Sequence, residues 1–236
     1  MEPMIADQLV LPVAPPEYFR FADYYAGENE QVVQYLKLLV EAKPDITQLC
    51  YLVGAPGTGK THLLHAVADN AVASDIPVIY LDMQALLPLS VECVAGLEQY
   101  RIVCLDNIHL VATHTKWQQA IFDLINRVLE AGHYIVFAAV GLPKSIDIEL
   151  KDLVSRLDWG LSFTLKALTD EQLIAALIIK ASAKGLKLSK EVASFLIKHF
   201  RRDMKSLVAV LERLDERSLK TQKNLTIPFV KAELKL

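Results

Sequence analysis

The stretch that decides the fold reads Gly54-Ala55-Pro56-Gly57-Thr58-Gly59-Lys60-Thr61 and fits the pattern G-x-x-x-x-G-K-[ST] in full. Glycines in such a loop let consecutive backbone N–H groups turn inward around phosphate oxygens. A helix opening at Lys60 would add its N-terminal partial positive charge, Lys60 would reach the β- and γ-phosphates, and the Thr61 hydroxyl would ligate Mg²⁺. A Gly-rich turn could match by chance, but the apolar run at 50–53 and the helical stretch after the loop supply the required context. We therefore predict a nucleotide site at this P-loop.

Short apolar runs alternate with helical stretches on both sides of the P-loop. Nearly continuous hydrophobicity is typical of parallel strands whose two faces are covered by helices, and the alternation predicts a βαβ array. We expect four buried strands, within 48–53, 78–81, 102–105 and 134–140. The helices between and before them are expected at 28–42, 61–72 and 116–130, with Gly132 as a C-cap signal.

The pattern changes after about residue 167, where the strands stop. Thr169 and Gln172 form a capping box, Ser189 caps a second helix, and amphipathic stretches continue to the end of the chain. Pro228 is tolerated in the first turn of a short last helix over 226–234. The predicted organisation is therefore an extended arm at 1–16, an α/β nucleotide-binding domain at 17–167, and an all-α domain at 168–236.

Composition excludes several classes of protein. The 236 residues are 53% hydrophobic and 22% charged, which is incompatible with general disorder. The mean hydropathy of +0.28 is high, yet the longest uncharged apolar runs, such as 134–143, are far shorter than the roughly 20 residues of a membrane span. A net charge of −3 argues against a bulk nucleic-acid binder. Three cysteines without metal spacing and an acidic start without an apolar signal segment predict a cytoplasmic protein.

A second nucleotide-site candidate is Asp106, at the end of the apolar run 102–105. It is placed to hold Mg²⁺ through water, although an ordinary strand can also end in Asp. The next position usually carries a carboxylate in oligomeric ATPases of this layout, and here it is Asn107. An amide cannot accept the proton of an attacking water, a loss of about 10²–10⁴ in rate. We therefore expect nucleotide binding with poor intrinsic hydrolysis.

Three other segments carry a resemblance to one family. Leu153-Val154-Ser155-Arg156-Leu157-Asp158-Trp159-Gly160 resembles the box VII segment of the bacterial initiator DnaA, and the segments 120–127 and 225–231 are similar to the DnaA-homologous regulators. The chain thus resembles the Hda family of AAA+ proteins over essentially its full length. The resemblance implies a P-loop NTPase (AAA+) parallel-sheet core with a small all-α lid, and a negative regulator of replication initiation.

The resemblance also assigns residue roles. Arg156 matches an arginine finger that acts in trans on ATP held by DnaA, a type of group worth about 10³–10⁵ in rate. From the sequence alone, a surface ion pair of Arg156 with Asp152 or Asp158 is the alternative. Trp159 is expected first as a packing residue, with a role in the interface around Arg156 as the other interpretation.

The arm carries the second partner prediction. Gln8-Leu9-Val10-Leu11-Pro12 resembles the sliding-clamp motif Q-L-x-L-P, in which Gln8, Leu9, Leu11 and Pro12 would bind the DNA polymerase III β sliding clamp. DNA would then be reached only indirectly, through the clamp. The family also implies ADP as the activating ligand, with ATP or another nucleoside diphosphate as alternatives, and self-association through AAA+ interfaces is left open.

Two sensor positions depart from the usual AAA+ pattern. The sensor 1 position falls at Val140, which cannot hydrogen-bond a γ-phosphate, and the sensor 2 position falls at Lys205 instead of arginine. Lys205 keeps a charge for the β-phosphate, and His62, next to the P-loop, is a further candidate contact with packing as its alternative. These features favour a regulator that stimulates the ATPase of DnaA over a robust ATPase. The alternative is a stand-alone DnaA-like or helicase-loader-like ATPase.

Overall fold

Five parallel strands form one sheet in the order β2-β3-β4-β1-β5. The computed structural model describes residues 19–43, 46–200, 202–221 and 225–234. The strands are β1 (Leu49–Val53), β2 (Val78–Asp82), β3 (Ile102–Asp106), β4 (Tyr134–Ala139) and β5 (Leu161–Thr164). The first four confirm the predicted strands to within one residue at each end. The P-loop follows β1 and Asp106 ends β3, so both lie at the carboxyl edge of the sheet.

The prediction of four strands is wrong by one, because β5 closes the sheet at its β1 edge. Its side chains alternate little between core and solvent: Phe163 is half-buried, whereas Leu161, Ser162 and Thr164 are exposed. The strand lacks the continuous apolar run used to locate the other four, and its alternation of apolar and polar residues (Leu161-Ser162-Phe163-Thr164) was overlooked. Gly160 allows its close pairing with β1, since a Cβ on Gly160 would stand 2.7 Å from the Leu49 carbonyl oxygen.

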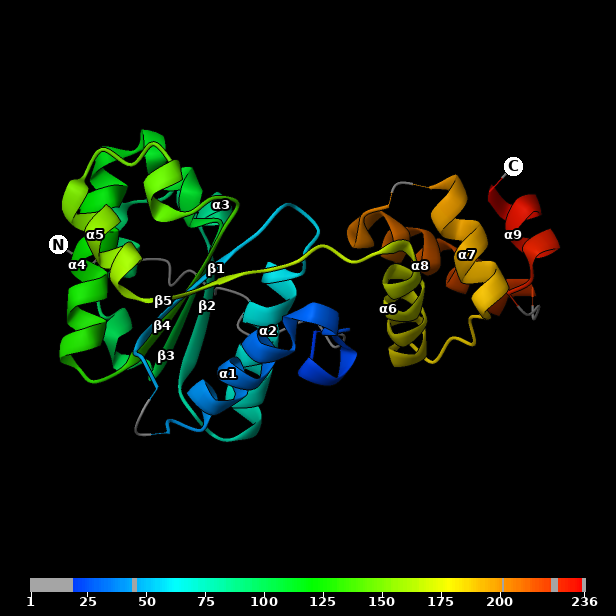
Figure 1. The fold of residues 1–236 in the computed structure, drawn as a ribbon, viewed down its shortest axis with the longest axis horizontal. Helices are drawn as coiled ribbons and strands as arrows, with labels where there is room; N and C mark the ends of the chain where they lie inside the picture. Colours follow the sequence, from blue (N-terminus) through cyan, green and yellow to red (C-terminus); the bar gives the residue numbers. More distant parts are fainter. Residues whose placement is uncertain (1–18, 44–45, 201, 222–224, 235–236) are drawn as a thin grey trace, which may run out of the picture.

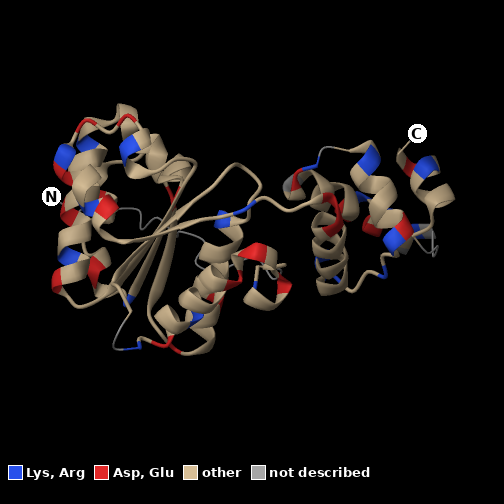
Figure 2. Cartoon of the chain, viewed as in Figure 1, with Lys and Arg blue, Asp and Glu red and all other residues tan. Residues whose placement is uncertain are grey.

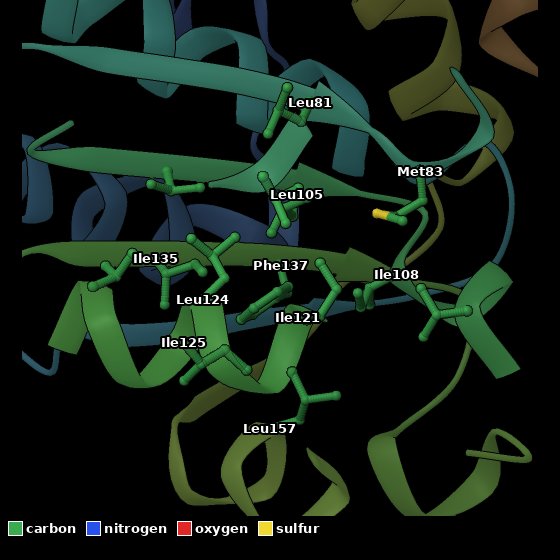
Figure 3. Packing of buried hydrophobic residues seen from close by; sticks show 14 of the residues in the cluster. Leu81, Met83, Leu105, Ile108, Ile121, Leu124, Ile125, Ile135, Phe137 and Leu157 are labelled. Carbon is green, nitrogen blue, oxygen red and sulfur yellow. The ribbon is translucent and has the colours of Figure 1, made fainter. Parts of the chain in front are cut away.

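Helices cover both faces of the sheet (Figure 1). Helices α1 (Glu30–Val40) and α2 (Lys60–Ala73) pack on one face, and α4 (Thr115–Glu130) and α5 (Lys151–Trp159) pack on the other. Helix α1 begins later than expected because 27–29 forms a 3₁₀ turn, η2 (Gly27–Asn29). Successive strand residues point to opposite faces. Phe137, for example, enters the α4–α5 core shown in Figure 3, while Val136 enters the α1–α2 core.

Short elements complete the carboxyl edge and the sheet's flanks. They are the one-turn helix α3 (Met83–Leu86) and the 3₁₀ turns η1 (Phe21–Asp23), η3 (Val91–Val94), η4 (Leu97–Gln99), η5 (Ile108–Thr113) and η6 (Pro143–Ser145). Turn η1 packs against α2 and against α6 (Asp170–Ala183) of the C-terminal helices.

The last four helices form a group with a hydrophobic cluster of its own (Figure 1). They are α6 (Asp170–Ala183), α7 (Lys190–His199), α8 (Met204–Thr221) and α9 (Ile227–Leu234), and we call them the lid. The predicted caps are confirmed: the Thr169 hydroxyl accepts from the backbone N–H of Gln172, whose side chain returns a bond, and Ser189 caps α7. The lid cluster contains no strand residue, so the lid has a hydrophobic core separate from the two cores on the faces of the sheet.

Charged residues of both signs are distributed along the chain. Acidic and basic residues are interspersed over both the sheet part and the lid in the view of Figure 2. Within the described ranges, no helix is both long and apolar enough to cross a membrane. The predicted arm at 1–16, with the candidate clamp residues, lies outside the described residues.

Candidate nucleotide-binding site

The P-loop has the backbone geometry of a phosphate cradle. Gly57 and Gly59 adopt φ angles of +83° and +91°, a region that residues with a Cβ rarely occupy. Gly59 has no room for a side chain either, because a Cβ there would stand 2.6 Å from a ring carbon of Tyr24. Helix α2 starts at Lys60, so its unpaired N–H groups point back into the loop.

Lys60 lies inside this loop. Its ammonium donates to the carbonyl oxygens of Gly54 at 2.6 Å and Ala55 at 3.0 Å. Burial lowers the pKa of Lys60, and the nearby Asp106 opposes that effect. A desolvated ammonium held beside inward-turned N–H groups is suited to an anionic ligand such as a di- or triphosphate.

Thr61 and Asp106, the two residues predicted to hold Mg²⁺, are in direct contact. The Thr61 hydroxyl donates to an Asp106 carboxylate oxygen at 2.6 Å, and the Tyr80 hydroxyl donates to the same oxygen at 3.1 Å. Asp106 is only 1% exposed. A hydroxyl and a buried carboxylate in contact form a fitting oxygen pair for Mg²⁺, which binds proteins through few ligands and keeps several waters.

Asn107 does not point toward the P-loop. Its backbone is left-handed, with φ +56°, and its side-chain amide donates to Asp82 Oδ1 at 2.9 Å. Asp82 ends β2, which neighbours β3 on the side opposite β4 and β1. The Asn107 side chain is therefore turned away from the strand that leads into the P-loop.

The segment before α1 covers the P-loop from outside the sheet. Besides its ring contact with Gly59, Tyr24 donates from its hydroxyl to the Thr58 carbonyl at 3.3 Å. Asn29, which is buried, donates to the Lys166 carbonyl and accepts from the Lys166 N–H at 2.8 Å. Asn29 thus fixes this segment to the connection that leads into the lid. Sequence analysis missed both Tyr24 and Asn29, since neither belongs to a periodic pattern or to a motif considered there.

His62 links the P-loop helix to the lid. Its Nδ1 lies 2.8 Å from the Lys180 ammonium of α6, and its Nε2 lies 2.8 Å from the Arg20 carbonyl. An ammonium can only donate, so Nδ1 accepts and Nε2–H donates to the carbonyl. Burial first, and the Lys180 charge second, lower the pKa of His62 to about 4. With both ring nitrogens engaged, His62 is a structural connector in this arrangement, and nucleotide contact through it stays a prediction.

The lid approaches the P-loop at the start of α8. A Cβ on Gly57 would lie 3.7 Å from the Cβ of Asp203, whose carboxylate accepts from the Ser206 N–H and so caps α8. Lys205 follows in the first turn of α8, and its role at the phosphates stays a prediction. Val140 comes directly after β4 and is exposed, and its assignment to the sensor 1 position stays a prediction.

Arg156 lies on α5, in the layer across the sheet from α2. Leu153 and Leu157 anchor this helix in the core, and Arg156 is exposed between them. The alternative of a surface ion pair with Asp152 or Asp158 is not seen: Asp158 pairs with Lys144, and the described ion pairs include none from Arg156. Trp159 is 61% exposed, so its expected packing role is wrong.

Two family models match the chain. The model of the bacterial DnaA ATPase domain matches residues 16–164, well over half of the chain, and the model of the Hda lid domain matches residues 170–234. The chain belongs to the DnaA-type AAA+ family. The chain is an Hda-like member of that family, because its lid matches the model of the Hda lid domain.

Solved structures agree with this family assignment at the level of the fold. Domain III of DnaA from Thermotoga maritima has a TM-score of 0.78 at 21% identity, covering 92% of this chain and 95% of that one. Aquifex aeolicus DnaA bound to AMPPCP has a TM-score of 0.70 at 20% identity, and the match covers 88% of this chain and 68% of that one. The RuvB Holliday junction branch migration motor of T. maritima has a TM-score of 0.66 at 17% identity. That match covers 92% of this chain and 73% of the RuvB chain. The DnaA-type core and helical lid are thus a shared AAA+ architecture.

Proposed function

We propose that this Hda-like protein is a DnaA-related regulator that holds a nucleoside diphosphate and supplies Arg156 to ATP bound on DnaA. The position of Arg156 carries the proposal. Its guanidinium is exposed, lies across the sheet from α2 and is not engaged in a described ion pair. An exposed guanidinium is planar and always charged, so it is suited to stabilise the negative charge that develops on the γ-phosphate of ATP bound to another protein.

The protein's own nucleotide site supports the other part of the proposal, that the protein retains a nucleoside diphosphate. The P-loop, Lys60, Thr61 and Asp106 form a phosphate and Mg²⁺ site, in which the metal would screen phosphate charge. Asn107 offers no proton acceptor and Val140 no hydrogen bond to a γ-phosphate. This site would therefore retain ADP, with ATP or another diphosphate as weaker candidates. The solved DnaA of A. aeolicus binds AMPPCP, a triphosphate analogue.

The test measures ATP hydrolysis by DnaA in the presence of clamp loaded on DNA. Wild-type protein should stimulate hydrolysis, and Arg156→Ala should lose stimulation by about 10³ or to the baseline. Lys151→Ala, which removes another exposed cation from the same helix, is the matched control and should stimulate normally. Stimulation that survives Arg156→Ala overturns the proposal. ATP turnover of several per second by the protein alone would instead favour the stand-alone ATPase.

Clamp binding through the arm completes the proposed regulator. Gln8, Leu9, Leu11 and Pro12 would bring the protein to DNA-loaded clamps, so that DnaA is inactivated where replication is under way. In a pull-down with the DNA polymerase III β clamp, replacing Gln8, Leu9 and Leu11 together by Ala should abolish binding. The same variant should keep its affinity for ADP. Undiminished clamp capture would show that the arm does not carry this contact.

A further inference from the structure

Three described hydrogen bonds hold the carboxylate of Asp106. Its Oδ2 accepts from the Thr61 hydroxyl at 2.6 Å and from the Tyr80 hydroxyl at 3.1 Å, and its Oδ1 accepts from the Asn107 backbone N–H at 2.8 Å. A carboxylate that is 1% exposed needs such donors, because burying a charge without them is costly. Thr61 belongs to the P-loop motif and Asn107 is the next residue, so Tyr80 is the donor that comes from a separate element, β2.

The register of the sheet explains how Tyr80 reaches Asp106. Tyr80 pairs with Cys104 in the parallel register of β2 and β3, and Asp106 lies two residues further along β3. Residues two apart in a strand project from the same face, so Tyr80 and Asp106 both project from the face that α2 covers. An aromatic side chain is long enough to span such a diagonal between neighbouring strands.

His65 contacts the ring of Tyr80 from the side of α2. Thr61 and His65 are four residues apart on α2, so they lie on the same face of this helix. The rings of His65 and Tyr80 are stacked, with centroids 4.0 Å apart and planes 30° from parallel. His65 Nδ1 is buried and has no hydrogen-bond partner within the described residues, so stacking is the interaction by which this ring acts on Tyr80. One face of α2 thus engages Asp106 twice, directly through Thr61 and indirectly through His65 and Tyr80.

We propose that Tyr80 is a positioning residue that orients the Asp106 carboxylate for Mg²⁺, and that His65 fixes the ring of Tyr80 in the place this requires. Groups that hydrogen-bond a metal-binding carboxylate set its orientation, and their loss typically costs about 10–100-fold in metal affinity. The hydroxyl of Tyr80 stands in this relation to Asp106. The inference rests on the proposed nucleotide and Mg²⁺ site, but it is independent of Arg156.

The experiment titrates Mn²⁺ into the full chain with ADP bound and follows the metal by electron paramagnetic resonance, because Mn²⁺ prefers the same oxygen ligands as Mg²⁺. Tyr80→Phe removes only the hydroxyl and keeps the stacked ring, and it should weaken Mn²⁺ binding by about tenfold. Its affinity for ADP in EDTA should equal that of the wild type. Tyr35→Phe is the matched control: this hydroxyl donates to the Thr47 carbonyl at 2.9 Å, at the amino edge of the sheet, and its removal should leave Mn²⁺ binding unchanged.

Variants of His65 measure its part separately. His65→Phe keeps a ring that can stack on Tyr80 and should bind Mn²⁺ as the wild type does. His65→Ala removes the ring and should weaken Mn²⁺ binding toward the level of Tyr80→Phe. In the Tyr80→Phe background, His65→Ala should add no further loss, since the hydroxyl that it holds in place is already absent.

The role of Tyr80 is overturned by either of two results. One is unchanged Mn²⁺ affinity in Tyr80→Phe, and the other is an equal loss of ADP affinity in EDTA, which would show a general effect on the fold. Wild-type Mn²⁺ affinity in His65→Ala would overturn the part assigned to His65. Stimulation of DnaA by the wild-type chain is measured in parallel, and its absence with the Mn²⁺ pattern intact counts against the proposed function alone. A wild-type chain that binds neither ADP nor Mn²⁺ would overturn both.

Discussion

Acid should weaken the connection between the P-loop helix and the lid through His62. The ring of His62 is 6% exposed, accepts from Lys180 and donates to the Arg20 carbonyl. Protonation at Nδ1 would place two donors face to face and a second positive charge beside Lys180. The charged or titratable groups that act on the ring are Lys180 of α6, Asp23 of η1 and His65 of α2, and only Asp23 favours the protonated form.

The magnitude follows from the pKa of His62, which is about 4 in the folded state against an ordinary 6.5. Between these pH values the unfolded chain binds more protons than the folded one, so the free energy of unfolding decreases as the pH falls. Moving from pH 7 to pH 5 should cost roughly 2 kcal/mol through this one group. The loss is essentially absent above pH 7.

The assay is urea unfolding at pH 7.0, 6.0, 5.5 and 5.0, followed by circular dichroism and by fluorescence of the buried Trp117. His62→Gln can still donate to Arg20 and accept from Lys180, but it does not titrate. Its stability should therefore fall by roughly 2 kcal/mol less than that of the wild type over the same pH range. His199→Gln, which replaces an exposed histidine on α7 outside this contact, is the control variant. Equal slopes for wild type and His62→Gln would refute the reasoning.

Two glycines give further predictions. Gly59→Ala should destabilise the protein by about 2 kcal/mol or more, from its left-handed φ and its clash with Tyr24, and should also weaken ADP binding. Urea unfolding and calorimetry check this, and unchanged ADP affinity would contradict the P-loop geometry. Gly160→Ala should cost about 1–3 kcal/mol because its Cβ would meet Leu49 in β1, while leaving ADP affinity intact. Wild-type thermal stability of Gly160→Ala would show that β5 can shift without loss.

Much of the core was accessible from local sequence patterns. The apolar runs located β1, β3 and β4 because both faces of these strands are buried, and β2 because its first two residues and Leu81 are buried. The P-loop motif fixed the start of α2 at Lys60, and caps such as Thr169 and Ser189 fixed the starts of lid helices. These signals are local, since they depend on a few neighbouring residues and their contact with core or solvent.

The remaining features required the tertiary structure. Strand β5 is exposed on most of its side chains and is held by pairing with β1. Its sequence, Leu161-Ser162-Phe163-Thr164, alternates apolar and polar residues over only four positions and lacks the continuous apolar run by which the other strands were found. The exposure of Trp159 likewise depends on what packs against the end of α5. No sequence pattern reports how two distant surfaces meet.

The sequence by itself determined that this chain has a phosphate-binding loop, a parallel sheet and a helical lid. It also identified the missing carboxylate at Asn107, because residue type can be read directly. Only the tertiary structure decided that Asn107 turns to Asp82 and that His62 meets Lys180 of the lid. These partners are 25 and 118 residues apart in the chain. Their contacts arise from strand order and from the docking of the lid, which the packing of the whole chain sets.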